Sequence, residues 1–249
     1  MTAEASAPPR FIEFERCFNF RDIGGYVGRD GRRVRWGRLY RSMTPEYMTP
    51  ADVEKARKLG IGFVFDIRGW LASSGPLGEP PGRRFAHRPR RRTFWTPDMV
   101  QAYRQLPPEV QLPQVVDRLG RAFAKAVALM ADEESATLFH CRLGKDRSGV
   151  FAALLLKLLG VGDEDVIAEY LLSGNAAEIA RPLVTEDGDD PTQSESRVVR
   201  EPATRHLMEL TLARLRDEYG GAYAYLHRHG VPKYKLNRFI ERTLEPAGS

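Results

Sequence analysis

The sequence predicts an α/β domain with a mostly parallel central sheet flanked by helices, and two patterns support this. Short apolar runs alternate with segments of helical periodicity, which is the order that places parallel strands beside crossover helices. At the centre of the chain, the apolar run Ala136–Phe139 leads into a polar turn, 140–149, and then into the apolar stretch Val150–Leu156. We interpret these three segments as a buried strand, a turn and a buried helix.

Two strands and two helices are predicted before this turn. Val34–Arg41 and Ile61–Asp66 have the pattern of strands, and the segment from about Ala51 to Leu59 between them has that of a helix. Arg84–Arg88 is a further candidate strand. Apolar residues then recur every three or four positions, which predicts an amphipathic helix: Val115, Val116, Leu119, Phe123, Val127 and Met130.

The chain after the turn is predicted to be mainly helical. Gly160 is expected to end the central helix, and Asp163 is the predicted N-cap of the next one. The helical pattern continues from 201 to 244, with interruptions at Gly220-Gly221 and at Gly230–Pro232.

Two strongly charged segments are predicted to be exposed. Residues 184–200 are polar, and their acidic part, Glu186–Ser196, indicates a surface loop. Six arginines within ten residues indicate either a solvated loop or a surface for phosphorylated or acidic ligands: Arg83, Arg84, Arg88, Arg90, Arg91 and Arg92. Because no nucleic-acid-binding motif accompanies them, we expect no nucleic-acid partner.

The composition is that of one globular domain. A chain of 249 residues that is 42% apolar and 29% charged can bury a sizeable core. It has no apolar run near the roughly 20 residues that span a bilayer and no classical secretory signal. We expect residues 1–10 to form a disordered tail, 11–249 to form the domain, and the protein to be cytoplasmic, with non-classical secretion as the alternative. Two cysteines do not suggest a disulfide framework.

The central turn has the residues of a nucleophile in an anion-binding loop. A strand that leads into a helix N-terminus leaves backbone N–H groups unpaired, and the helix dipole adds positive charge. A thiol in such a turn ionises readily, and the thiolate is a nucleophile. Arg147 offers a planar, two-pronged donor to phosphate oxygens. The spacing of Cys141 and Arg147 therefore predicts attack on a phosphomonoester through a phosphocysteine.

The predicted roles cover the whole turn. The predicted catalytic residues are Cys141, Arg147, Asp146 and Ser148. The predicted substrate-binding residues are His140, Arg142, Leu143, Gly144, Lys145 and Asp66. Ser148 would hydrogen-bond the thiolate, whereas His140 either orients the loop and favours the thiolate or is purely structural. No cluster of His, Cys and Glu has metal-ligand spacing, and cysteine chemistry needs no cofactor, so none is expected.

The turn also carries a family resemblance. Its sequence, His-Cys-x-x-Gly-Lys-Asp-Arg-Ser-Gly, resembles the signature loop of protein tyrosine phosphatases, and is similar to a bacterial branch with dual or triple specificity. Further motifs of that branch follow in order: Asn19–Gly25, Leu39–Ser42, Asp66–Arg68, Tyr103–Pro107 and Asp165–Tyr170. The resemblance spans roughly Phe18 to Leu244. It implies a single phosphotyrosine-phosphatase-like domain and a phosphorylated protein as substrate, with phosphotyrosine and also phosphoserine or phosphothreonine as targets.

The resemblance also implies finer assignments. Residues 93–108 would form a helical lid in which Trp95 and Tyr103 cover the substrate; the alternative is that both aromatics pack in the core. Lys145 would place a second cation beside the bound phosphate, which suits phosphoinositides. A phosphoinositide phosphatase is therefore one alternative function. A catalytically lapsed phosphate-binding module is the other. Cys17 is expected to be a resting thiol rather than a redox partner of Cys141.

The general acid has three candidates. Asp146 is favoured by the unbroken Gly-Lys-Asp-Arg match, although its two cationic neighbours and the helix N-terminus all favour its ionised form. Asp98 is the rival, because Trp-Thr-Pro-Asp resembles the Trp-Pro-Asp loop of classical relatives with one insertion. Asp66 is the third candidate, and it could equally orient Arg147.

Overall fold

The computed structural model describes residues 8–68, 104–185 and 197–246. In this part of the chain a four-stranded sheet has the order β1-β3-β5-β4. The strands are β1 (Arg21–Asp22), β3 (Leu39–Ser42), β5 (Ala136–His140) and β4 (Ile61–Asp66). β3, β5 and β4 are parallel and only β1 runs antiparallel to its neighbour, so the predicted mostly parallel α/β architecture is confirmed.

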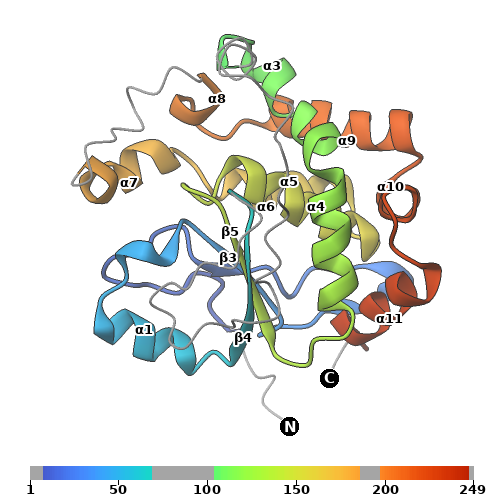
Figure 1. Cartoon of the computed structure of the whole chain (residues 1–249), viewed down its shortest axis with the longest axis horizontal. Helices are drawn as coiled ribbons and strands as arrows, with labels where there is room; N and C mark the ends of the chain where they lie inside the picture. The colour runs from blue at the N-terminus through green and yellow to red at the C-terminus, as the bar shows by residue number, and fades with distance from the viewer. Residues whose placement is uncertain (1–7, 69–103, 186–196, 247–249) are drawn as a thin grey trace, which may run out of the picture.

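Helices cover both faces of this sheet (Figure 1). α1 (Pro50–Arg57) and α7 (Ala176–Val184) lie on one face, and α4 (Gln114–Met130) and α5 (Asp146–Leu158) lie on the other. The other described helices are α3 (Pro108–Gln111), α6 (Asp163–Leu171), α8 (Arg197–Arg200), α9 (Arg205–Tyr219), α10 (Ala222–Arg228), α11 (Lys233–Thr243) and the 3₁₀ turns Arg29–Gly31 and Pro45–Tyr47.

The two faces follow the alternation of side chains along each strand. Phe65 and Phe139 both pack edge-on against Phe151 of α5, with ring centroids 5.1 Å apart in each pair. Their neighbours Val64 and Leu138 belong to the separate apolar cluster on the α1 side. Both faces are apolar, and for that reason the parallel strands appear in the sequence as short continuous apolar runs.

The predicted strand Val34–Arg41 proves to be two strands. β2 (Arg33–Val34) ends at a turn in which Gly37 has a φ of +71°, and β3 begins after it. β2 pairs instead with β6 (Leu244–Glu245) in a second, antiparallel sheet. Because a positive φ is open mainly to glycine, Gly37 was the signal that one strand could not continue through this segment.

Most helix boundaries follow from capping. Thr49 and Asp52 form a reciprocal capping box that starts α1 at Pro50, and the predicted strand Ile61–Asp66 is confirmed as β4. Gly160, with a φ of +86°, follows the end of α5 as expected.

The N-cap assignment of Asp163 was wrong. Gly162 occupies the N-cap of α6, and the carboxylate of Asp163 lies 2.6 Å from Nζ of Lys157 instead. An acidic side chain in the first turn is stabilised by the helix dipole without capping it. The expected glycine breaks are confirmed, with φ values of +72°, +92° and +106° at Gly220, Gly221 and Gly230.

Several expectations concern residues outside the described part. These are the candidate strand Arg84–Arg88 with its arginine cluster, residues 93–103 of the predicted lid, including Trp95, Asp98 and Tyr103, and the acidic segment Glu186–Ser196. Residues 1–7 of the predicted tail lie outside as well. Arg10, also assigned to that tail, donates to the carbonyls of Asp22 and Gly24 and so belongs to the folded part. No helix in the described residues is both long enough and apolar enough to span a membrane.

Candidate active site

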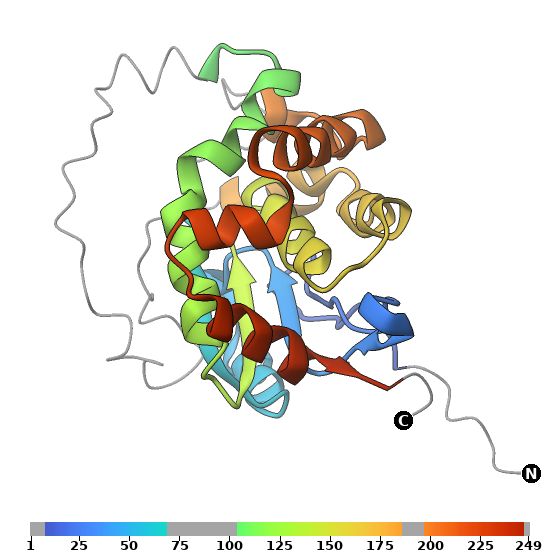
Figure 2. The same cartoon turned by 90° about the vertical axis from the view of Figure 1, so that its right-hand side faces the viewer.

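The Cys-x5-Arg loop lies where the parallel strands end. Cys141 directly follows β5, and α5 begins at Asp146, so the predicted strand, turn and helix are confirmed. β3 and β5 point in the same direction toward this loop (Figure 2). The carboxyl edge of parallel strands is the usual position of ligand sites in α/β proteins.

Neighbouring segments bind successive carbonyl groups of this loop. The Arg142 carbonyl accepts a hydrogen bond of 3.0 Å from the Thr44 amide. The Leu143 carbonyl accepts one of 3.2 Å from Nδ2 of Asn19. Asn19 itself has a φ of +57°, a left-handed conformation that asparagine tolerates better than most residues.

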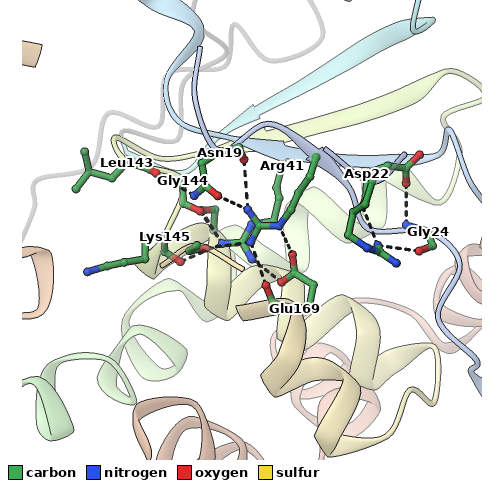
Figure 3. Close-up of polar contacts among 12 residues, drawn as sticks. Asn19, Asp22, Gly24, Arg41, Leu143, Gly144, Lys145 and Glu169 are labelled. Atoms are coloured by element: carbon green, nitrogen blue, oxygen red, sulfur yellow. Dashed lines mark hydrogen bonds and ion pairs between the residues drawn. The ribbon is translucent and has the colours of Figure 1, made fainter. Parts of the chain in front are cut away.

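The next two carbonyls share one donor. Nη2 of Arg41 lies 2.6 Å from the Gly144 oxygen and 3.0 Å from the Lys145 oxygen (Figure 3). The N–H and C=O of a trans peptide point in opposite directions. The amides of residues 143–146 therefore turn away from these partners, and successive N–H groups that turn the same way form an anion-binding nest.

Gly144 is required by this conformation. Its φ is +69°, and a Cβ at this position would lie 2.5 Å from the Ser42 carbonyl carbon and 2.6 Å from the Met43 nitrogen. These are backbone atoms of the adjoining segment and cannot move aside. Only glycine lets the loop pack this closely against the end of β3.

The thiol of Cys141 faces the start of α5. Its side chain is 3% exposed, and its Sγ lies 3.4 Å from Oγ of Ser148. The Ser148 hydroxyl is thus within reach of the sulfur, as expected for a group that would stabilise a thiolate. For Cys17, by contrast, burial raises the pKa of the thiol to about 12, so it stays protonated at neutral pH, as a resting thiol would.

Arg147 is available for an anion. It lies half-buried in the first turn of α5, and among the residues that the structure describes it has no carboxylate partner. A cation at a helix N-terminus opposes the dipole and is favourable there only when an anion is bound.

The suggestion that Asp66 orients Arg147 was wrong. Both carboxylate oxygens of Asp66 accept hydrogen bonds from Arg68, at 2.8–3.2 Å. Nη2 of Arg68 also lies 2.6 Å from Oε1 of Glu46. Asp66, Arg68 and Glu46 therefore form an ion-pair cluster at the end of β4. Asp66 and Arg68 are two positions apart in the sequence, and this proximity was a signal for their pairing.

The environment of Asp146 differs from the expectation. Its side chain is only 13% exposed, and this burial raises the pKa of its carboxyl although Lys145 and Arg147 both act to lower it. The sequence predicted an ionised carboxylate from its charged neighbours alone, because the burial of the Asp146 side chain cannot be inferred from the sequence. A raised pKa is suited to a group that must hold a proton before it donates it.

Lys145 contacts α8 and the residue that follows it. Its ammonium is buried, donates to the Val199 carbonyl at 3.2 Å and to the Glu201 carbonyl, and lies 3.4 Å from Oδ1 of Asp146. Its side chain points away from Arg41 (Figure 3). The expected second cation beside the phosphate is thus engaged in a different contact.

Removal of this ammonium is expected to cost stability. Lys145→Met leaves two carbonyls without a charged donor, which typically costs about 1–3 kcal/mol, measured as the free energy of unfolding in urea. Lys55→Met is the control. Lys55 likewise donates to a backbone carbonyl, that of Glu13, but from an exposed position where water can replace the ammonium. Unchanged stability of Lys145→Met, with a selective loss of turnover on phosphoinositides, would place this ammonium at the substrate instead.

His140 is buried and neutral. Burial lowers the pKa of its imidazole despite Asp66 nearby, and its Nδ1 lies 3.3 Å from the Cys141 carbonyl. Its own carbonyl accepts a hydrogen bond of 2.9 Å from the Ile67 amide, which joins the loop to β4. Of its two expected roles, the geometry fits orientation of the loop, and the imidazole adds no positive charge to the thiolate.

Three residues that hold this loop were not assigned roles from the sequence: Asn19, Arg41 and Glu169. Each belongs to a motif recognised there, and the motif matches were the only signal available. Within the described ranges, no group of three or more His, Cys, Asp or Glu side chains is arranged to hold a metal ion.

At one helix N-terminus the structure brings together a thiol, an arginine with no carboxylate partner among the described residues, and a loop whose amides turn away from its supports. These are the groups that a phosphate-binding loop of the Cys-x5-Arg class requires. The comparison with known families agrees with this class. A model of the tyrosine phosphatase family matches residues 12–245, and the chain belongs to that family.

The chain is also similar to three proteins of related name. It is 36% identical over 178 residues to a Cupriavidus necator protein with the provisional name of a tyrosine-protein phosphatase; this match covers 65% of the chain and 62% of the relative. A tyrosine-protein phosphatase of Nostoc commune is 31% identical over 46% of the chain and 41% of its own length. The triple specificity protein phosphatase PtpB of Mycobacterium tuberculosis is 26% identical over 70% of the chain and 73% of its own length. The chain thus spans less than two thirds of the first two relatives.

Proposed function

We propose that this protein is a cysteine-dependent protein tyrosine phosphatase that hydrolyses phosphomonoesters through a phosphocysteine on Cys141. The observation that carries this proposal is the position of the thiol, which lies at the entrance to α5 beside Ser148. It lies in a loop whose Leu143, Gly144 and Lys145 carbonyls accept hydrogen bonds from Asn19 and Arg41. Membership of the tyrosine phosphatase family supports it, and the match over residues 12–245 supports a phosphatase domain spanning 11–249.

In the first step, the Cys141 thiolate attacks phosphorus. The S–P bond forms while the P–O bond to the leaving group breaks, and Asp146 gives its proton to the departing oxygen. Arg147 and the amides of the nest bind the equatorial phosphate oxygens, where the charge of a loose transition state is concentrated. The raised pKa of Asp146 supports this role, because the carboxyl must be protonated when substrate arrives.

In the second step, water attacks the phosphocysteine. Asp146, now ionised, takes a proton from the water, the O–P bond forms, and the S–P bond breaks to release the thiolate and inorganic phosphate. The hydroxyl of Ser148, 3.4 Å from Sγ, would stabilise the sulfur as it takes up negative charge.

Hydrolysis of a chromogenic aryl phosphate tests the reaction class. We expect turnover that is unaffected by a metal chelator and is blocked when Cys141 is alkylated. Binding of inorganic phosphate without any hydrolysis would indicate the catalytically lapsed module, and loss of activity on chelation would refute the cysteine mechanism.

The choice between Asp146 and Asp98 is testable through the leaving group. Asp146→Asn should lower kcat by on the order of 10²-fold on an alkyl phosphate, whose leaving oxygen needs a proton, and far less on a substrate with a very acidic leaving group. Because only the protonated carboxyl is active, kcat for the alkyl phosphate should fall as pH rises through the Asp146 pKa, and this limb should be absent in Asp146→Asn.

Asp98→Asn is the matched control for that experiment. We expect its kcat to show no added dependence on the leaving group, and its pH profile to keep the fall in kcat at higher pH. If Asp98→Asn shows both effects and Asp146→Asn shows neither, the proton comes from Asp98, as in the classical Trp-Pro-Asp arrangement.

The substrate class is a finer proposal. We favour phosphorylated proteins, with phosphotyrosine first and phosphoserine or phosphothreonine as further targets, in a cytoplasmic setting. Phosphoinositides are the second candidate, supported by the arginine cluster of residues 83–92 in the sequence. Lys145 does not add to this support, because its ammonium binds the Val199 and Glu201 carbonyls. Parallel turnover of phosphotyrosine peptides, phosphoserine peptides and phosphoinositides decides among them, since the highest kcat/KM identifies the preferred class.

A further inference from the structure

A buried ionic cluster lies behind the phosphate-binding loop. Glu169 of α6 accepts from Nε of Arg21 at 2.7 Å and from Nη1 of Arg41 at 2.6 Å. All three side chains are at most 1% exposed. Two guanidinium groups therefore share one carboxylate in the interior, and the cluster retains a net positive charge.

Only one of the two arginines contacts the loop. Nη2 of Arg41 donates to the Gly144 and Lys145 carbonyls and lies 3.4 Å from Oγ of Ser148 (Figure 3). Arg21 uses its corresponding Nη2 on the Glu169 carbonyl and on Ser173, both away from the loop. Its Nη1 donates to the carbonyl and side-chain oxygens of Asn19, so it reaches the loop only indirectly. The two residues thus have the same charge, burial and carboxylate partner but differ in contact with the site.

The geometry gives Arg41 two effects on the loop. By binding two successive carbonyls, it fixes the peptides whose amides form the nest. Its guanidinium also adds a buried positive charge next to Ser148, whose hydroxyl lies 3.4 Å from the Cys141 sulfur. In a low-dielectric interior, such a charge stabilises an anion strongly. Other charged or titratable groups at the loop are Arg142, Lys145, Asp146 and Arg147 of the loop and of the α5 start, His140 with Asp66 beside it, and Tyr170 of α6.

We propose that Arg41 is a positioning residue, held by Glu169, that keeps the amide nest in its phosphate-binding form and places a buried positive charge beside Ser148 and the Cys141 sulfur. This inference rests on the proposed phosphatase function. Lysine cannot replace it, because a single ammonium lacks the planar fork that reaches Glu169 and both carbonyls together.

Alkylation by iodoacetamide over a range of pH tests this inference without turnover. The thiol of Cys17 has a pKa near 12, so reaction near neutral pH reports on Cys141. In Arg41→Lys the rate of Cys141 alkylation near neutral pH should fall about tenfold, because a buried positive charge near the sulfur is displaced. Affinity for inorganic phosphate, measured by calorimetry, should fall about tenfold, the effect of one lost charge-assisted hydrogen bond.

Arg21→Lys is the matched control, because it removes a buried fork from the same Glu169 and has no direct contact with the loop. Apart from Glu169, its link to the loop among the described residues is through Asn19, at the Leu143 carbonyl. It should lose folding stability to a similar extent yet change the alkylation rate of Cys141 and the phosphate affinity much less. Equal shifts in both variants, or none in Arg41→Lys, would overturn the inference while leaving the phosphatase proposal intact. If a variant does not fold, Glu169→Gln should shift both quantities in the direction of Arg41→Lys, with Glu164→Gln on the exposed side of α6 as its control. A wild-type Cys141 that neither reacts as a thiolate nor binds phosphate would refute the proposed function itself.

Discussion

Cys141→Ser is expected to abolish turnover while leaving phosphate binding intact. A serine hydroxyl has a much higher pKa than a thiol, and none of the side chains placed at the sulfur acts as a base for it: Ser148 is a donor, and the imidazole of His140 is directed to the Cys141 carbonyl. The amides of the nest and Arg147 do not depend on the sulfur. The measurement is kcat on an aryl phosphate together with calorimetric binding of inorganic phosphate.

Cys17→Ser is the control for this substitution. Cys17 is equally buried, but it belongs to the apolar cluster on the other side of the sheet and its thiol is protonated at neutral pH. The control should lose some stability and keep its turnover. Undiminished hydrolysis by Cys141→Ser would show that another residue carries the reaction.

Arg147→Lys is expected to lower kcat by on the order of 10²- to 10³-fold, the usual effect of removing one preorganised donor to transition-state oxygens. Arg147 has no carboxylate partner among the described residues, so its planar fork is free to bind two phosphate oxygens. Lysine keeps the charge but not the paired geometry. The loss should therefore appear in kcat more than in KM.

Arg205→Lys provides a comparison for this variant, because Arg205 is also at a helix start but pairs with the exposed Glu164 on the surface. Its kcat should equal that of the wild type, since exposed ion pairs contribute little. A near-native kcat for Arg147→Lys would assign Arg147 a structural role.

The central part of the fold could be predicted because its signals are local. The strand at Ala136–Phe139, the helix after it and the glycine that ends that helix each depend on a few adjacent residues. Even the wrong prediction of one strand over Val34–Arg41 had a local signal in Gly37.

The supports of the loop could not be derived in this way. The hydrogen bond from Asn19 to Leu143 and those from Arg41 to Gly144 join residues 124 and 103 positions apart. The direction of the Asp146 pKa depends on how deeply α5 is packed, which no neighbouring residue reveals. The motif order showed that these residues belong together but not which atoms meet.

The contact of Lys145 illustrates the same limit. Its position within the loop sequence predicted that Lys145 would be a second cation beside the phosphate. In the folded chain its ammonium binds carbonyls of residues 54 and 56 positions later. The role of Lys145 therefore depends on the position of α8 and of the residue after it, which only the tertiary structure supplies.

Chemical trapping of the covalent intermediate tests the central claim most directly. The wild-type protein would be mixed with an aryl phosphate, quenched rapidly in acid and digested for peptide mass spectrometry. The mechanism predicts one phosphoryl group on the peptide that contains Cys141, and its absence from the same peptide of Cys141→Ser. Turnover with no such adduct, or with an adduct on another residue, would contradict the phosphocysteine mechanism.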